Sequence, residues 1–485
     1  MGAPIVTYLL LLSLSLYGYG HTNTVVPVPE DSTSTSPSGG KAISINVGLN
    51  MAMRGFNRFI LKDEYARINL SSMGDNLKTR PVWDTNRFST NFIGHSYHGS
   101  MYFNSARANG LDLYQSSVVT AAGSLMWEYL METKPPSRND LWATTAGGTA
   151  LGEALFRFSD LILDNRATGL ERVGRELLAG ILAPTRLITR LTTGEAWKTG
   201  RFKGNILYAS PYSLELYFGE TTTGVADRDL NLWRSAMGTE LQYGELFETI
   251  VEKPYEWFRL AGEAHIGNGC FRLSQVNTIG LLFNKELFHN NETWVTAGLF
   301  QHFNYYDLNR VLNKDGVIPL YLSEAASIGP GIIIQKRKDR RKAQIEVHLS
   351  GIILGAGTSD HFKLEDRDYN FGSGFSLKLY SSLEFKQKIT ISLFSENYLL
   401  FSWKGVDDYE VLEHLTINEI DFLNVQGDKS SSRLCLLGLN MKYRLNERTH
   451  IILKARHLTR DTTYKYFPNV NYSSNELFFG IGMNV

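Results

Sequence analysis

The second part of the chain, from about residue 206 onward, alternates apolar and polar residues in one segment after another. In the segment 435–445 the odd-numbered positions are all apolar, whereas Asn440, Lys442 and Arg444 occupy even-numbered positions. Successive side chains of a β-strand point to opposite faces, so this pattern predicts a strand with one apolar and one polar face. Such a strand is longer than the mode of about five or six residues in soluble sheets and reaches the roughly 9–11 residues that cross a bilayer.

The same alternation recurs often enough to close a barrel. Clear cases lie at 258–266, 342–349 and 375–386, and polar breaks such as 309–316 separate the segments. Weaker segments bring the total to about twelve strands, an even number that suits a single-chain outer-membrane barrel. We therefore expect a mostly β chain in which residues 201–485 form an antiparallel transmembrane β-barrel. The alternative is a soluble periplasmic protein with a half-buried antiparallel sheet.

The N-terminus favours export. The run from Ile5 to Leu16 is apolar but too short to span a bilayer, and Gly18 and Gly20 provide the small residues that a signal peptidase needs. We expect a signal peptide at 1–20, then a disordered linker at 21–42 that is rich in Pro, Ser, Thr and Gly. Because the barrel is expected to be exported, we expect the protein to lie in the outer membrane of a Gram-negative cell. The alternative interpretation of residues 1–20 is a buried N-terminal segment.

Composition excludes several classes of protein. The chain has 49 basic and 49 acidic residues, so nothing indicates a nucleic-acid partner. A mean hydropathy of -0.19 excludes a polytopic helical membrane protein. Two cysteines, Cys270 and Cys435, cannot form a disulfide scaffold; one bridge between them stays open, and Cys435 reads as a small hydrophobe.

We expect residues 43–200 to form a helical domain. After a short strand at Ile43–Met51 we expect helices at 97–108, 111–132, 138–164 and 169–182. Capping-box signals at Ser137 with Asp140 and at Thr168 with Glu171 begin the last two, and Pro184 stops the second of them.

The helix predicted at 138–164 carries a polar stripe of Thr149, Glu153, Arg157 and Asp160. The plain interpretation is a solvated face with an ion pair between positions 153 and 157. The sharper interpretation is that the helices dock against the polar interior of the barrel, because a lumen of about twelve strands is wider than side chains alone can fill. The predicted helix contacts with the lumen are Arg107, Glu128, Gly148, Gly152, Glu153, Arg157 and Asp160; the predicted lumen partners are Glu240, Glu263, Glu346, Lys378, Lys442, Arg444, Lys454 and Arg456.

The densest polar and aromatic stretch is PVWDTNRFSTNFIGHSYHGSMYFNSARANG at 81–110, followed by GSLMWE at 123–128, ND at 139–140, GG at 147–148 and LGE at 151–153. This block, about residues 80–192, resembles the bacterial family known as domain of unknown function 3943. The family usually has His-Pro-Tyr where this chain has His95-Ser96-Tyr97. The resemblance implies an envelope protein, often with a barrel-like C-terminal region, and it implies no reaction.

Two chemical hypotheses arise in this block. His95 and His98 lie three apart and could bind a metal with Glu128 or Asp84, although such a pair is more often a hydrogen-bonded structural one. We expect no metal and no cofactor. Ser100 could be a nucleophile with His98 as base and Asp140 or Glu128 as orienting group, as in a lipid hydrolase.

The hydrolase hypothesis is the weaker one. Positions two apart on a helix point in different directions, and the chain has no nucleophile-elbow pattern. We therefore expect a non-enzymatic outer-membrane barrel with a pore, transport or structural role. Its expected partners are outer-membrane lipid and a small solute or a periplasmic protein. A membrane-embedded lipid-modifying hydrolase that uses His95, His98, Ser100 and Glu128 is the alternative.

Overall fold

The computed structural model describes residues 37–84, 86–198, 211–225, 231–246, 251–267, 270–308, 320–362, 368–403, 405–406 and 426–485. The chain splits into two compact units, one helical and one a barrel. The predicted signal peptide, and the predicted linker as far as residue 36, lie outside the described residues. In the described part of the chain, no helix has the length and apolar character needed to cross a membrane.

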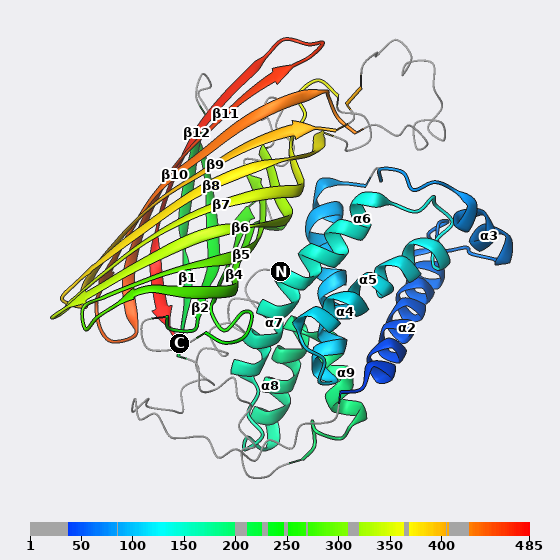
Figure 1. Cartoon of the computed structure of the whole chain (residues 1–485), viewed down its shortest axis with the longest axis horizontal. Helices are drawn as coiled ribbons and strands as arrows, with labels where there is room; N and C mark the ends of the chain where they lie inside the picture. Colours follow the sequence, from blue (N-terminus) through cyan, green and yellow to red (C-terminus); the bar gives the residue numbers. More distant parts are fainter. Residues whose placement is uncertain are drawn as a thin grey trace. The chain divides into compact units, whose positions relative to one another are not determined.

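The barrel consists of twelve strands in a closed antiparallel order (Figure 1). Each strand pairs with its neighbours in sequence, and β1 pairs with β12 to close the sheet. This confirms the predicted fold class. The strands are β1 (Tyr212–Val225), β2 (Asn231–Tyr243), β3 (Phe258–Gly267), β4 (Cys270–His289), β5 (Thr293–Leu308), β6 (Leu320–Lys338), β7 (Arg341–Thr358), β8 (Tyr369–Phe385), β9 (Ile389–Ser402), β10 (Ser430–Arg444), β11 (Thr449–Tyr464) and β12 (Val470–Asn484).

The apolar residues of the strands face outward. On β7, Ile345 and Leu349 are 51% and 52% exposed, whereas Glu346 and His348 between them are almost fully buried in the interior. A soluble barrel buries its apolar face and exposes its polar one, so this inverted arrangement rejects the soluble-sheet alternative and suits a barrel surrounded by lipid. Cys435 is a free cysteine on β10.

The connections differ between the two ends of the barrel. Four of the five connections at the end where β1 begins and β12 ends are short turns, at 290–292, 339–340, 386–388 and 445–448, and the fifth, 244–257, is longer. At the other end, the connections 226–230, 268–269 and 465–469 are short, whereas 309–319, 359–368 and 403–429 are longer. Mostly short turns at one end and the longest connection at the other are typical of outer-membrane barrels, whose short turns are periplasmic and whose long loops are extracellular. We call the two ends the turn end and the loop end.

The helical unit agrees with the predicted helices in most places. The helices predicted at 97–108, 111–132 and 169–182 are present, and the one predicted at 138–164 runs from α6 through a π-helical turn into α7. Its elements are α2 (Gly39–Phe56), α3 (Leu70–Lys78), α4 (His95–Ala108), α5 (Leu113–Leu130), α6 (Arg138–Trp142), α7 (Gly148–Ile162), α8 (Gly169–Leu182) and α9 (Pro184–Thr192), with π-helical turns at Asn57–Leu61, Thr90–Gly94 and Ala143–Gly147.

Two local predictions in this unit are wrong. The strand predicted at Ile43–Met51 lies in α2, as do the last residues of the predicted linker. The helix buries Asn46 and Asn50, which donate to the carbonyls of Tyr102 and Gly123, so its inner face is polar and leaves no apolar helical period in the sequence. Ser137 caps α6 as predicted, but the side chain of Thr168 makes no capping bond to α8.

Helices α4 and α7 approach each other backbone to backbone. A Cβ atom added to Gly99 would lie 1.9 Å from the carbonyl oxygen of Thr144, and one added to Gly148 would lie 2.7 Å from the Cα atom of Gly99. A Cβ added to Gly152 would meet the ring of Phe103. Gly148 therefore lies against the backbone of α4, and Gly152 lies against the Phe103 side chain of the same helix.

Gly99→Ala is expected to destabilise the helical unit by about 1–3 kcal/mol, because the added methyl group has no room between the two backbones. The matched control is Gly174→Ala on α8, where a Cβ would meet nothing within 4 Å. This control should stabilise the unit by roughly 0.5–1 kcal/mol, since alanine is the better helix former. Urea unfolding followed by circular dichroism at 222 nm measures both; equal effects of the two substitutions would contradict the close approach.

Candidate functional site

The polar stripe of α7 is buried within the helical unit. Glu153 is fully buried and forms ion pairs with Arg107 of α4 at 2.7 Å and with Arg157 at 2.8 Å. Burial alone would raise the pKa of Glu153, but the two guanidinium groups overcome it and lower that pKa below its usual value. The stripe is therefore not a solvated face.

The remaining members of the stripe also have partners in the helical unit. Asp160 forms an ion pair with Arg186 of α9, and the Arg186 guanidinium carbon lies 4.2 Å from the centroid of the Phe156 ring. Thr149 donates to the carbonyl of Thr145. These contacts account for the polarity of the stripe without a lumen partner.

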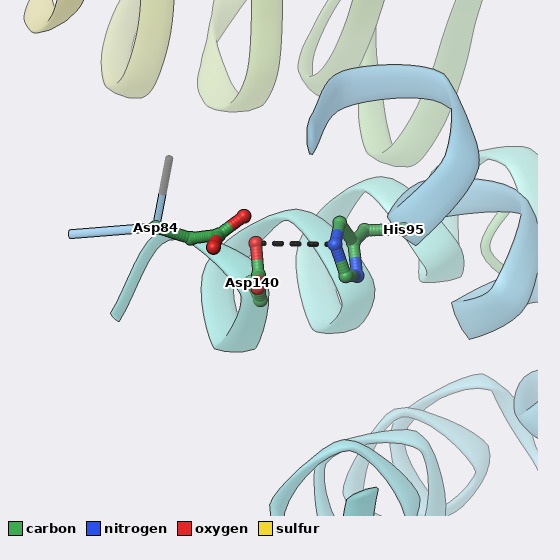
Figure 2. A group of neighbouring side chains, drawn as sticks. All are labelled: Asp84, His95 and Asp140. Atoms are coloured by element: carbon green, nitrogen blue, oxygen red, sulfur yellow. Dashed lines mark ion pairs between the residues drawn. The ribbon is translucent and has the colours of Figure 1, made fainter. Parts of the chain in front are cut away.

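A second buried polar group combines residues from three places in the chain. One ligand atom from each of Asp84, His95 and Asp140 lies within 4.8 Å of the other two, and Nε2 of His95 is 3.3 Å from Oδ1 of Asp140 (Figure 2). His95 begins α4, and Asp140 lies in the first turn of α6. We call these three residues the Asp-His-Asp cluster.

Backbone pairing brings Asp84 beside Asp140. Val82 and Ser137 form an isolated parallel bridge, in which the Val82 N–H donates to Pro136 and the Arg138 N–H donates to Val82. Asn139 then contacts both acidic residues: its Oδ1 accepts from the backbone N–H of Asp84 at 2.8 Å, and its Nδ2 donates to Oδ1 of Asp140 at 2.7 Å.

The carboxyl groups around this cluster repel one another. Burial first, and then the charges of Asp84 and Glu132, raise the pKa of Asp140 well above its ordinary value. Burial and the charge of Asp84 raise the pKa of Glu132 to about 8. Burial, with Glu132 and Asp140, also raises the pKa of Glu128. Lys134 lowers the pKa of Asp140 and that of Glu132, but its effect is smaller than that of Asp84.

The barrel interior is crossed by ion pairs between strands that are not neighbours. Because these strands are separated in the barrel order, their side chains meet only across the lumen. We call this set the lumen network. Its pairs are Lys442 of β10 with Glu215 of β1 (2.8 Å) and Glu240 of β2 (3.0 Å), Arg456 of β11 with Glu263 of β3 (3.0 Å), Arg259 of β3 with Glu346 of β7 (2.8 Å) and Lys378 of β8 with Glu324 of β6 (2.5 Å).

The charged residues predicted for the lumen are mostly members of this network. Lys454 joins it through an ion pair with Glu240 at 3.1 Å. The exception is Arg444, which is exposed at the last position of β10, at the turn end of the barrel. The lumen charges thus pair with one another across the barrel.

A cavity of about 550 Å³ opens in the barrel among these charges. The lining of the cavity includes residues at the start of β1 and the end of β2, so the cavity lies toward the turn end of the barrel. Both acidic and basic side chains line it. Tyr306 and Leu436 also line it, and both belong to a cluster of buried apolar residues that continues from the cavity toward the loop end. Tyr306 and Tyr398 donate hydrogen bonds to the same Glu396 oxygen, at 2.9 and 2.5 Å.

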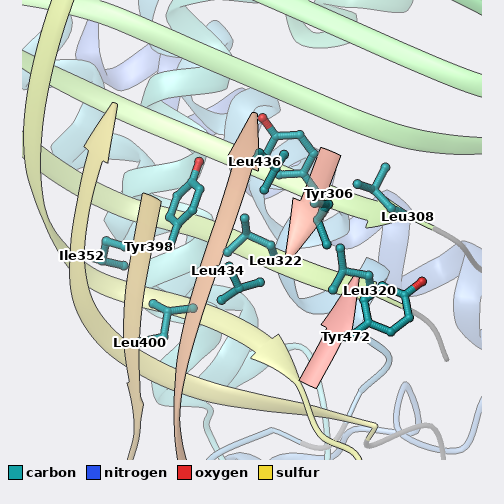
Figure 3. Packing of buried hydrophobic residues seen from close by; sticks show 11 residues of the cluster. Tyr306, Leu308, Leu320, Leu322, Ile352, Tyr398, Leu400, Leu434, Leu436 and Tyr472 are labelled. Atoms are coloured by element: carbon teal, nitrogen blue, oxygen red, sulfur yellow. The ribbon is translucent and has the colours of Figure 1, made fainter. Parts of the chain in front are cut away.

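The apolar cluster, which we call the lumen plug, joins opposite walls of the barrel (Figure 3). Leu322 on β6 and Leu434 on β10 are fully buried in it, although three strands separate β6 from β10 in the barrel order. Its members are Tyr306, Leu308, Leu320, Leu322, Ile352, Tyr398, Leu400, Leu434, Leu436, Leu458 and Tyr472.

Part of the helical unit matches a protein-family model. Residues 80–185 match the family described as "Domain of unknown function (DUF3943)". This confirms the resemblance predicted for residues 80–192, and the match covers well under half of the chain. No curated protein sequence matches the chain.

Solved structures similar to the chain are barrels. The NanC porin is 10% identical, with a TM-score of 0.28, over 56% of this chain and 100% of its own. The outer membrane channel DcaP of Acinetobacter baumannii is 10% identical, with a TM-score of 0.21, over 56% and 97%. Outer membrane phospholipase A from Escherichia coli is 8% identical, with a TM-score of 0.25, over 56% and 90%. Similarity at this level carries no functional argument.

In the DUF3943 segment, His95 and His98 have different surroundings. His95 faces Asp140, whereas the ring of His98 lies 4.5 Å from that of Tyr102 and 5.2 Å from that of Trp127, centroid to centroid. Burial, with the nearby His95, lowers the pKa of His98 to about 3. The two histidines thus do not form the metal pair considered from their spacing.

Ser100 and Glu128 of the DUF3943 segment have structural partners. Ser100 is fully buried and its hydroxyl donates to the carbonyl of Tyr97 at 2.7 Å, while Glu128 accepts from the backbone N–H of Ser137 at 2.7 Å. No hydrogen bond among these described residues joins the Ser100 hydroxyl to His98, because the two positions point to different sides of α4. Ser100 and His98 are therefore not arranged as the nucleophile and base considered from the sequence.

Proposed function

We propose that this chain is an outer-membrane barrel that works as a gated pore for small polar solutes. The observation that carries the proposal is the sequence of environments along the lumen: a charged cavity toward the turn end, followed by the lumen plug. The cavity volume of about 550 Å³ falls in the range of small-molecule sites, and its mixed charges suit a polar or zwitterionic solute.

The plug is the part of the lumen that would act as the gate. Buried apolar residues exclude water, and an apolar constriction stops conduction by losing its water column. Leucine side chains can leave such a constriction by changing rotamers without breaking backbone hydrogen bonds of the barrel wall. Outer-membrane placement is supported by the outward apolar face and by the short turns at one end.

The test is single-channel recording of the full-length chain in planar bilayers. The wild-type protein is expected to stay closed most of the time, whereas Leu322→Ala and Leu434→Ala, from opposite walls of the plug, are expected to give frequent discrete openings. The matched control is Leu437→Ala, which faces outward on the same strand as Leu434 and should behave like the wild type.

Each plug substitution removes buried volume and costs about 2–5 kcal/mol, so folding is checked by heat-modifiable migration on a detergent gel. Folded plug variants that stay as silent as the wild type would contradict the pore. A wild-type protein that conducts freely would contradict the plug as its gate.

A further inference from the structure

The Asp-His-Asp cluster has the donor types of a metal site. Two carboxylates and one imidazole are ligands that Zn²⁺ and Mn²⁺ accept, with bonds of about 2.0–2.2 Å. In a tetrahedral site such bonds place ligand atoms roughly 3.4 Å apart. The three atoms lie within 4.8 Å of one another, so shifts of about 1 Å would bring them around one ion.

His95 supplies a second and independent observation. Its Nε2 atom is buried and has no hydrogen-bond partner, although it lies 3.3 Å from a carboxylate oxygen of Asp140. Figure 2 shows the imidazole pointing toward the Asp140 carboxylate. The carboxylate of Asp84 lies on the far side of Asp140 from the imidazole. An unsatisfied buried nitrogen costs about 1–3 kcal/mol, and a bound cation would accept its lone pair.

The surroundings hold the ligands in place. Asn139 accepts from the Asp84 backbone and donates to the Asp140 carboxylate, so one side chain fixes the positions of both acidic residues. Ser137 in turn donates to Asn139 at 2.9 Å. Such outer partners are characteristic of built metal sites.

We propose that Asp84, His95 and Asp140 bind one divalent transition-metal ion, Zn²⁺ or Mn²⁺, in the DUF3943 segment. This site is independent of the proposed pore, because all of its ligands lie in the helical unit. The competing interpretation is a proton shared between His95 and Asp140 in place of the ion.

The experiment uses the full-length chain in detergent, stripped with EDTA and then titrated separately with ZnCl₂ and MnCl₂ in a calorimeter. We expect saturable binding of one equivalent of at least one of the two ions, together with a rise in the thermal midpoint of the 222 nm signal. Loss of an outer partner typically weakens metal binding about 10–100-fold, so Asp140→Asn and His95→Ala, which remove ligands, should weaken it by more than about tenfold.

The matched control is His98→Ala, which removes a buried imidazole one turn along α4 that makes ring contacts instead of facing the cluster. It should keep the stoichiometry and affinity of the wild type. Circular dichroism without metal shows which variants are folded, and Asp140→Asn keeps the shape of the side chain if His95→Ala does not fold. A wild-type chain that binds neither ion, or folded ligand variants that bind as well as the wild type, would overturn the site and leave the shared proton.

Discussion

Glu153→Ala is expected to cost the helical unit about 3–5 kcal/mol of unfolding free energy, which is the usual effect of removing one partner from a buried ion pair. The carboxylate of Glu153 now bridges Arg107 and Arg157, and both guanidinium groups would stay in the interior after the substitution. Urea unfolding of the full-length protein, followed at 222 nm, measures the loss.

The matched control is Glu171→Ala on α8. Glu171 also pairs with an arginine, Arg175, at 2.9 Å, but its side chain is half-exposed, so the loss should be only about 0.2–1 kcal/mol. Comparable losses at the two positions would contradict the role assigned to burial.

The difference between Glu153→Ala and the wild type should also depend on pH. The folded state lowers the pKa of Glu153, so the stabilisation is present above the unfolded pKa of about 4.3 and is lost as the pH falls through the folded value. The gap between the two proteins should therefore be full at neutral pH and shrink in acid. A gap that grows on acidification would contradict the lowered pKa.

The barrel could be predicted because its strands face two different solvents. In β10, the residues from Leu437 to Tyr443 alternate between lipid and lumen, and the alternation is local, so a single sequence displays it. The charges that point inward, such as Lys442 and Arg456, could be found in the same way. Their pairing with Glu240 and Glu263 on distant strands could not, since no local pattern records which walls face each other.

The helical unit was harder to predict because it buries polar residues. The stripe of α7 has the composition of an exposed or lumen-facing surface, yet Glu153 and Asp160 are paired by arginines of α4 and α9. In the same way, the buried face of α2 could not be recognised from hydropathy, because it carries the polar residues Asn46 and Asn50. Hydropathy reports how polar a face is, and only the tertiary partners decide whether that face is buried.

The Asp-His-Asp cluster was predicted in part. The sequence suggested His95 and His98 as a metal-binding pair, with Glu128 or Asp84 as the third ligand. The actual neighbour of His95 and Asp84 is Asp140, which reaches them through the bridge between Val82 and Ser137. A parallel bridge of one residue pair leaves no periodic trace, so its effect on the cluster could be found only in three dimensions.

Lys378→Met is expected to be among the most destabilising single substitutions in the barrel. Lys378 on β8 and Glu324 on β6 are fully buried, 2.5 Å apart, and Glu324 also accepts hydrogen bonds from Ser376 and Asn304. Removing the ammonium group leaves a carboxylate inside the lumen without its counter-charge, at a cost of about 3–5 kcal/mol. Urea unfolding of the refolded protein in detergent, followed by tryptophan fluorescence, gives the value.

The decisive comparison is a double-mutant cycle. Glu324→Gln alone should also destabilise the barrel, but the double variant Lys378→Met/Glu324→Gln should recover much of the loss, because the uncompensated charge is gone. The matched control is Lys338→Met at the end of β6, whose ion pair with Glu292 at 3.3 Å is largely exposed, so its effect should be below about 1 kcal/mol. Additive losses in the double variant would show that the two walls are not coupled through this pair.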